Sequence, residues 1–596
     1  MNRLKIIPLA ILAGCLYATA AQAQAPQTQQ EKSRLSPMNG RARQAHLPAK
    51  AKRLHSFTEQ FWASDEVRAW MQVTENPKSK YLNQQFGPPS AAALGQARNF
   101  LKQIAATQPS QMESRAPSGT VPCSGGPGAR FNLEPRTNAV PQTEPSADFI
   151  VNGTGPGADL IVQVANDARG NLTKVRWDGS VSGYYVHTST TADCSVQFEG
   201  GLPNFGGNLQ IGQEVVTADS VRGAFFVASD LLNNGAALFR AASADLLNPA
   251  ICPNGTHNQQ QSQSCWMQTP PALIDSGDFE GPELGIAVDE RLRGTGAGDV
   301  YVVGNSSVSQ SVFIQACTNA SLNCSPMVSI DQDDNYNAPF VQVRHDGLIT
   351  ISYMEFTPDG SDMVQFVTCA PTGAPNAPVC GKPTTATTVA TPLLEGGGEP
   401  DFIAPLQFSY TQHANREESN GSFTTFLVYD DCTNLYSPQP GNPPSYCLSS
   451  SVEMTFSTDN GQTWSQPVSV DTHNGFHIFP TITCDSSTGN VFIAHYSTEG
   501  DYFEHEIRVI VNQIAPGSTT LGSPQPATTF TPTDDPPFLG FQILAGFDLY
   551  MGAVAHGTGT PGQSHLYLSF DSEAVNGTYN RRPLPELNNH IKLVTF

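Results

Sequence analysis

The larger part of the chain contains few positively charged residues. Residues 119–596 carry 16 Lys and Arg against 47 Asp and Glu, a net charge of −31. So acidic a body repels phosphate backbones and anionic lipids, which argues against a nucleic-acid partner. Beyond the first twenty residues no stretch approaches 18 consecutive apolar residues. The sequence therefore argues against a transmembrane segment as well.

Several chemical signatures are also missing. The sequence contains no Gly-x-Ser-x-Gly elbow and no phosphate-cradling P-loop, so the chemistries that depend on them are set aside. It contains no Cys-x-x-Cys spacing. His473, His477 and His495 are too far apart along the chain for a local metal motif. The sequence alone thus leaves any metal ligands unknown.

The N-terminus has the pattern of an export signal over residues 1–23. Arg3 and Lys5 form a charged region, residues 6–20 are mostly apolar, and Ala21-Gln22-Ala23 fits a small-residue cleavage site. We expect a secreted or periplasmic protein. The stretch ending in Cys15 (Leu-Ala-Gly-Cys) also has the form of a bacterial lipobox. Lipidation of Cys15 would give an outer-membrane lipoprotein instead.

Residues 24–118 are expected to form a basic, partly helical leader or propeptide-like segment. Residues 26–118 carry a net charge of +7. Ser56 and Glu59 have capping-box spacing ahead of an aromatic-rich run. A second helix is predicted after Ser90, with apolar residues on one face.

From residue 119 to 596 the composition predicts an all-β domain. Apolar runs rich in β-branched residues end repeatedly in turn signals, and helix signals are few. The strand–turn–strand pattern of residues 340–353 recurs at 479–496, and looser copies start at intervals of roughly 55–80 residues, the repeat length expected of a β-propeller blade. Such units cannot bury both faces alone and must stack into a ring. We predict a β-propeller of four-stranded blades, with seven favoured and six the alternative.

One turn is more specific than the rest. Residues 457–464, S-T-D-N-G-Q-T-W, match the pattern S-x-D-x-G-x-x-W at every position. Gly461 suits a positive φ, Asp459 can accept turn N–H groups, and Trp464 can cover the hairpin. This pattern, which begins at Ser457, resembles the Asp box, or BNR repeat, of the sialidase-like propellers. The resemblance implies a structural turn on the outer rim of a blade.

The cysteines fall into close pairs. We expect disulfides to staple outer hairpins in blades that lack the box, through Cys252/Cys265, Cys317/Cys324 and Cys369/Cys380. Cys432/Cys447 is expected to close a Pro-rich loop, and Cys123/Cys194 to link the first blade to its lead-in. Cys484 is then the unpaired cysteine. Export to an oxidising compartment favours these bonds.

Acidic residues gather where each innermost strand is expected to begin, and such loops line the axial mouth of a propeller. They are Asp275, Asp278, Glu280, Asp331, Asp333, Asp334, Glu395, Glu399, Asp401, Asp471, Asp534 and Asp535. The cluster would suit Ca²⁺, glycoside hydrolysis, or a solvated rim that keeps the protein soluble. No cofactor is certain, and Ca²⁺ is the one candidate.

The resemblance to sialidases also implies possible chemistry. Those enzymes use three arginines to bind a carboxylate, a Tyr–Glu nucleophile and an Asp, but the Arg-Ile-Pro signature of the first arginine is absent here. Two functions therefore stay open. The first is a noncatalytic propeller that binds a glycan or an extracellular protein. The alternative is an exo-sialidase-like glycoside hydrolase, with candidate catalytic residues Asp334, Asp401, Asp535, Asp548 and Tyr550.

Overall fold

A computed structural model describes most of the chain from residue 142 onward. Before that it describes residues 68–69, 72, 83–84, 87–95 and 98. The segments left out beyond 142 are 156–157, 168–181, 189–195, 204–209, 232–234, 253–263, 275–283, 307–310, 332–335, 357–361, 390–409, 437–445, 474–476, 499–505, 529–530, 533–550 and 580–581. Within the described part, no helix is both long and apolar enough to cross a bilayer.

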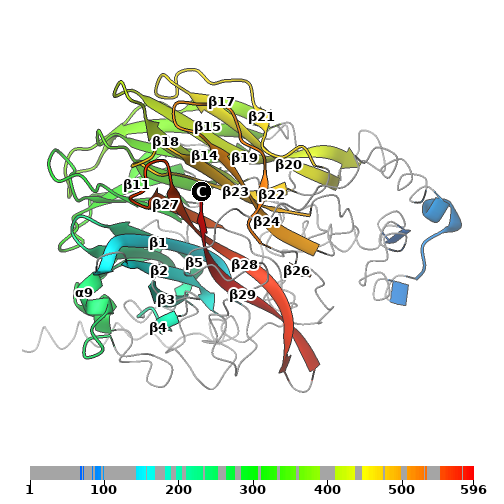
Figure 1. Cartoon of the computed structure of the whole chain (residues 1–596), viewed down its shortest axis with the longest axis horizontal. Coiled ribbons are helices and arrows are strands. Elements are labelled where there is room, and N and C mark those ends of the chain that lie inside the picture. The colour runs from blue at the N-terminus through cyan, green and yellow to red at the C-terminus, as the bar shows by residue number, and fades with distance from the viewer. Residues whose placement is uncertain are drawn as a thin grey trace, which may run out of the picture.

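The described strands form seven antiparallel sheets, each built from a contiguous stretch of chain (Figure 1). Blade 1 contains β1 (Gln142–Gly155), β2 (Ala158–Asp167), β3 (Ser182–Thr188) and β4 (Val196–Gly201). Blade 2 contains β5 (Gln210–Asp219), β6 (Ala224–Leu231), β7 (Ala236–Ala242) and β8 (Ala272–Ile274), with α9 (Ser243–Leu246) and the 3-10 turn η1 (Ser264–Met267) between its last two strands. Blade 3 contains β9 (Leu284–Val288), β10 (Val300–Ser306), β11 (Ser311–Cys317) and β12 (Val328–Asp331).

The remaining blades follow the same meander. Blade 4 contains β13 (Tyr336–Val343), β14 (Ile349–Phe356), β15 (Asp362–Ala370), β16 (Val379–Cys380) and β17 (Thr384–Val389). Blade 5 contains β18 (Thr411–Glu417), β19 (Phe423–Tyr436), β20 (Tyr446–Ser457) and β21 (Val468–Ser469). Blade 6 contains β22 (His477–Cys484), β23 (Val491–Ser497), β24 (Glu506–Ile514), β25 (Gln525–Pro526) and β26 (Thr531–Pro532). Blade 7 contains β27 (Gly552–Gly557), β28 (Ser564–Tyr579) and β29 (Arg582–Thr595).

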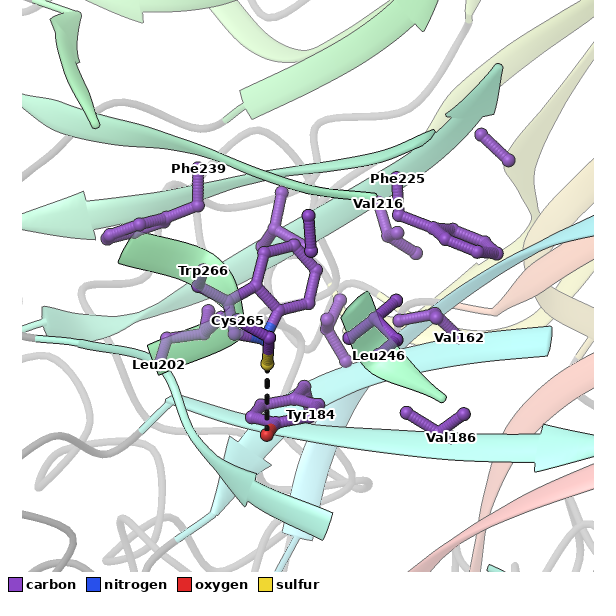
Figure 2. Close-up of a cluster of buried hydrophobic side chains, with 14 of the residues drawn as sticks. Val162, Tyr184, Val186, Leu202, Val216, Phe225, Phe239, Leu246, Cys265 and Trp266 are labelled. Atoms are coloured by element: carbon purple, nitrogen blue, oxygen red, sulfur yellow. Dashed lines mark hydrogen bonds between the residues drawn. The ribbon is translucent and has the colours of Figure 1, made fainter. Parts of the chain in front are cut away.

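The first strand of every blade contacts the first strand of the next, and β27 contacts β1, so the ring closes. The predicted all-β propeller is confirmed, with seven blades and not six. Each of the seven blade interfaces holds its own apolar cluster. The cluster between blades 1 and 2 includes Tyr184, Phe225, Phe239 and Trp266 (Figure 2).

The strands are apolar on both faces because each blade is covered on both sides. All eight residues of β6 are buried. Phe225 and Val227 pack against blade 1, whereas Phe226 and Ala228 face blade 3. Alternate side chains along one strand therefore serve two different interfaces. This explains why the sequence shows short continuous apolar runs in place of a polar–apolar alternation.

The Asp box forms the turn between β20 and β21, the two outer strands of blade 5. Asp459 accepts hydrogen bonds from Thr463 N (2.9 Å) and Thr463 Oγ1 (2.6 Å), and Ser457 Oγ accepts one from Gly461 N (2.9 Å). Trp464 Nε1 donates to Gly461 O (3.1 Å), and its ring packs edge-on against Phe366 of blade 4. The box thus stabilises its own turn and joins blade 5 to blade 4.

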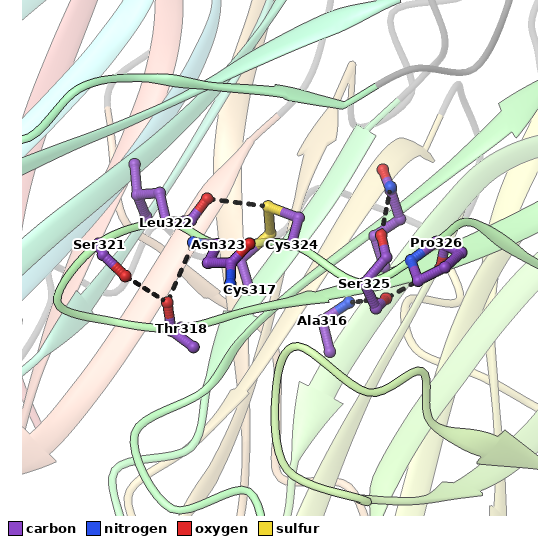
Figure 3. Close-up of a disulfide and its surroundings, with 10 residues drawn as sticks. Ala316, Cys317, Thr318, Ser321, Leu322, Asn323, Cys324, Ser325 and Pro326 are labelled. Atoms are coloured by element: carbon purple, nitrogen blue, oxygen red, sulfur yellow. Dashed lines mark hydrogen bonds between the residues drawn. A yellow bond between two sulfur atoms is a disulfide. The ribbon is translucent and has the colours of Figure 1, made fainter. Parts of the chain in front are cut away.

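Three disulfides occupy the corresponding connection, from third to fourth strand, in blades 2, 3 and 4. They are Cys252–Cys265, Cys317–Cys324 (Figure 3) and Cys369–Cys380. Cys484 is a free thiol on β22, and burial raises its pKa to about 12. Cys15, Cys123 and Cys194, and the side chains of Cys432 and Cys447, lie outside the described residues.

Little of the leader is described. Residues 91–95 are helical, directly after Ser90, whose Oγ accepts a hydrogen bond from Ala93 N (3.2 Å). This is the N-cap geometry expected from the sequence. Residues 68–69 and 72 are helical too. The predicted export signal and the capping pair Ser56 and Glu59 lie outside the described residues.

Candidate functional site

The ring has two chemically different ends. Because strands alternate in direction within a blade, the innermost strands begin at one end, here called the mouth end, where the second strands also finish. The turns between first and second strands, and between third and fourth strands, lie at the opposite end, here called the base. A hydrogen bond from Arg344, in the first turn of blade 4, to Asn460 of the Asp box (2.5 Å) joins two base turns.

Most of the described arginines of the ring lie at the base, and Arg508, near the start of β24, is the exception. In four consecutive blades the first turn holds an arginine beside a carboxylate: Asp219–Arg222, Asp289–Arg291, Arg344–Asp346 and Arg416–Glu418. Each arginine also donates to the following blade, to Arg291 O, Asp346 O, Asn460 Oδ1 and Ala515 O respectively. These arginines therefore hold neighbouring blades together.

The candidate catalytic residues predicted from the sequence are not among the residues that the structure describes. Asp334, Asp401, Asp535, Asp548 and Tyr550 all lie outside the described residues. So do the other acidic residues predicted at the mouth, except Asp331 and Asp471. Asp331 accepts a hydrogen bond from Tyr353 Oη (2.6 Å). Asp471 lies close to two histidines, His477 and His495.

Asp471 lies in the connection between β21 and β22, which leads from blade 5 to blade 6. His477 begins β22, and His495 lies near the end of the paired strand β23. Ile493, two residues before His495, packs into the cluster between blades 5 and 6, so His495 faces blade 5. His477 pairs with Ser497 and shares that face. The three side chains consequently meet at the interface of blades 5 and 6.

The three side chains are almost completely buried, with exposed fractions of 2% for Asp471, 1% for His477 and 0% for His495. Asp471 Oδ2 lies 3.7 Å from His477 Nδ1 and 3.7 Å from His495 Nε2. These distances are too long for hydrogen bonds. Within the described part of the chain, none of the three atoms has a hydrogen-bond partner. Buried polar atoms are rarely left in this condition.

Hydrogen bonds hold the other polar atoms of Asp471 and His477, whereas His495 Nδ1 also has no hydrogen-bond partner among the described residues. Asp471 Oδ1 accepts hydrogen bonds from His473 N (2.9 Å) and from the His473 ring. His477 Nε2 contacts His473 O (2.8 Å), so this nitrogen carries the proton and Nδ1 presents its lone pair toward Asp471. The connection residue His473 therefore orients both neighbours.

The local electrostatics fix the charge states. Burial lowers the pKa of His477 to about 4, against the attraction of Asp471, so its imidazole is neutral at pH 7. Burial opposes ionisation of Asp471, but His495 and His477 outweigh it and place the pKa of the carboxyl below its usual range. Arg508 lies near the start of β24. Burial lowers the pKa of its guanidinium, although the nearby Asp471 carboxylate acts in the opposite direction. A carboxylate and a neutral imidazole are metal-ligating forms.

A second group, Asp159, His556 and His565, lies at the base between blades 7 and 1. It differs from the first in being bonded internally. Asp159 Oδ2 accepts hydrogen bonds from His556 Nε2 (2.6 Å) and Tyr567 Oη (2.6 Å). Burial opposes protonation of His556, yet the bond to Asp159 raises its pKa. This group has the contacts of a structural ion-pair network.

The members of the first group are too widely separated along the chain for a local motif, and for that reason His473, His477 and His495 were not predicted as metal ligands. The structure brings His477 and His495 to one carboxylate through the pairing of β22 with β23. Asp471 was expected at the mouth as one of many acidic residues. The available signal was a pair of histidines on consecutive strands after an aspartate.

Comparisons with known proteins give distant matches only. No family model matches the chain, and no curated protein does. Similar solved structures include a Hadza microbial sialidase (9% identity, 68% of this chain and 73% of that chain, TM-score 0.35). Others are AofleA from Arthrobotrys oligospora (7%, 64% and 88%, 0.33) and the alpha-L-arabinofuranosidase from Podospora anserina (13%, 52% and 89%, 0.26). At these values an activity has to be inferred from this chain's own residues.

Proposed function

We propose that the protein is an exported, noncatalytic recognition propeller that binds a glycan or an extracellular protein at its mouth end. Three disulfides favour an oxidising compartment, in agreement with the export signal expected at residues 1–23. Whether Cys15 anchors the protein as an outer-membrane lipoprotein is a separate question, which the mass of the mature N-terminus answers. The propeller ring supplies a mouth built from loops of seven blades, where such folds hold their ligands.

The distribution of arginines carries the proposal. Seven arginines of the ring have described side chains: Arg222, Arg240, Arg291, Arg293, Arg344, Arg416 and Arg508. All but Arg508 lie in base turns or at the base end of a strand. Binding a sugar carboxylate as sialidases do needs bidentate cations that converge at the mouth. The described residues supply one such cation, and it already lies near Asp471.

The alternative is a glycoside hydrolase of exo-sialidase type, acting through Asp334, Asp401, Asp535, Asp548 or Tyr550. Such an enzyme needs two carboxyl groups, or a Tyr–Glu pair, roughly 5–9.5 Å apart in one pocket. The experiment is a panel of fluorogenic aryl glycosides, including the sialic acid derivative, run beside a glycan array on the same preparation. We expect array binding without release of fluorophore. Turnover that disappears in Asp535→Asn or Tyr550→Phe would establish the hydrolase and overturn the proposal.

A further inference from the structure

We propose that Asp471, His477 and His495 bind one divalent transition-metal ion of the Zn²⁺ class between blades 5 and 6. This inference is independent of the recognition function, since the three side chains are buried between blades 5 and 6 and are not exposed to a ligand at the mouth. It rests on the convergence of three buried donor atoms from three segments: the β21–β22 connection, β22 and β23.

The spacing of the donor atoms suits a small cation. The three atoms lie within 4.8 Å of one another, and both distances from Asp471 Oδ2 are 3.7 Å. Zinc bonds of about 2.0–2.2 Å in tetrahedral geometry place ligand atoms about 3.3–3.6 Å apart. Shifts of a few tenths of an ångström would bring each imidazole nitrogen to this distance from Asp471 Oδ2. Approach of the two imidazoles, whose ligand atoms lie within 4.8 Å of each other, would then complete three of four positions. An ion there would satisfy Asp471 Oδ2, His477 Nδ1 and His495 Nε2, three of the four unpartnered atoms of this group.

The surrounding contacts are those that support metal ligands. A ligating histidine commonly donates its second ring nitrogen to a carbonyl, which fixes its tautomer. His477 makes this contact through Nε2 to His473 O (2.8 Å). Asp471 is held through Oδ1 by His473, which leaves Oδ2 aimed at the two imidazoles. Asp471 and His477 are thus oriented before any ion arrives, whereas His495 is held by its burial between blades 5 and 6.

The backbone next to His477 explains how the histidine reaches this interface. Phe479 has φ of 52°, a conformation that costs energy for a bulky side chain. The pairing of β22 with β23 is irregular between Ile478 and Thr481, and Asp430 Oδ2 accepts a hydrogen bond from Phe479 N (3.2 Å). This bulge is what places His477 on the same face as His495. The innermost strands of blades 1, 2 and 4 are also irregular near their starts, so the bulge positions His477 without by itself marking a metal site.

The base group provides an internal comparison. Its Asp159 and His556 are bonded directly to each other at 2.6 Å, so a metal would have to break that bond. In the mouth-end group no such bond has to be broken. We therefore assign the ion to Asp471, His477 and His495 and not to the base group.

The donor set also selects the ion. Two imidazole nitrogens and one carboxylate suit Zn²⁺, Cu²⁺, Ni²⁺ or Co²⁺, whereas Ca²⁺ prefers six to eight oxygen ligands. Ca²⁺, the candidate ion suggested by the acidic residues, is not favoured at this position. The competing account is a buried His–Asp ion pair that holds no metal, with Asp471 charged and one histidine protonated.

The experiment measures metal content and coordination in the full-length protein. The protein is stripped of metal with a chelator and equilibrated with Zn²⁺ or Co²⁺. Gel filtration then removes unbound ion, and inductively coupled plasma mass spectrometry measures the metal that remains bound. We expect one equivalent per chain in the parent protein. With Co²⁺ we expect visible absorption bands of a low-coordinate nitrogen–oxygen site, and no displacement by Ca²⁺.

Variants separate this site from the rest of the chain. His495→Gln and Asp471→Asn should weaken binding by about 100-fold or more, whereas the matched control His556→Gln should bind as the parent does. Zn²⁺ should also raise the melting temperature of the parent protein, a readout that needs no variant. If the parent protein, after stripping and re-equilibration with Zn²⁺, holds no stoichiometric Zn²⁺, the proposal fails and the group is a metal-free ion pair. Undiminished binding by a folded His495→Gln protein overturns it equally.

Discussion

Substitution of Gly461 by alanine tests how tightly the Asp box joins two blades. Gly461 has φ of +81°, and a Cβ built there would lie 2.4 Å from Phe366 Cδ1 of blade 4. Gly421, in the first turn of blade 5, has nearly the same φ, +79°, but no atom lies within 4 Å of its Cβ position. An alanine would therefore suffer similar backbone strain at either glycine, but only at Gly461 would its Cβ clash with a neighbouring side chain.

The expected free energies follow from that difference. An alanine in this left-handed conformation costs about 1–2 kcal/mol at either glycine. The Gly461→Ala variant adds an overpacking cost of about 1–3 kcal/mol, because Phe366 is 1% exposed and cannot move away freely. Its ring is held edge-on by Trp464 and by His413. We expect Gly461→Ala to lower the free energy of unfolding by about 2–5 kcal/mol, and Gly421→Ala by the strain alone.

Urea unfolding followed by tryptophan fluorescence provides the measurement, with midpoints compared at equal slope. Trp464 lies in the affected contact and reports on it directly. Equal destabilisation by the two substitutions would refute the reasoning, because it would mean that blade 4 does not press on the Asp box. A larger effect at Gly421 would refute it as well.

Two further predictions concern buried charge at blade interfaces. His413 is bonded through both ring nitrogens, to Ser352 Oγ (2.9 Å) and Thr350 Oγ1 (2.8 Å), and burial lowers its pKa to about 3. Its neutral form is favoured in the native state, so the stability it contributes is present above pH 6.5 and decreases as the pH falls, by about 2 kcal/mol at pH 5. Urea midpoints across this range should show that loss, and a His413→Gln protein whose midpoints fall just as steeply would contradict it. Arg416→Met should cost about 3 kcal/mol, because it removes a buried guanidinium that joins blades 5 and 6, while the exposed Arg293→Met should change the midpoint little.

Much of the fold could be predicted from the sequence because its signals are local. The Asp box at residues 457–464 is a turn whose hydrogen bonds are made within eight residues, so its residues specify it directly. The disulfides Cys317–Cys324 and Cys369–Cys380 close short loops between third and fourth strands for the same reason. The repeat length then gives the ring, since a single blade leaves both faces uncovered.

The arginines of the base show where local signals end. Each occupies a strand turn beside a carboxylate, and this pattern recurs in four blades. The sequence around Arg222 and Arg344 shows each arginine in a turn beside an aspartate. Their second partner is a carbonyl or side chain of the next blade, about 70 or more residues away, and no local pattern reveals that partner.

The grouping of Asp471, His477 and His495 depends on a single bulge. In an unbroken strand His477 and Ile482 would face opposite sides, because five residues separate them and side chains alternate. Ile482 packs toward blade 5, and so does His477, because the irregularity between Ile478 and Thr481 inserts an extra residue. Without that residue His477 would face blade 7, away from His495. A change of register by one residue therefore decides whether two scattered histidines share a carboxylate, and the sequence pattern does not resolve register to that level.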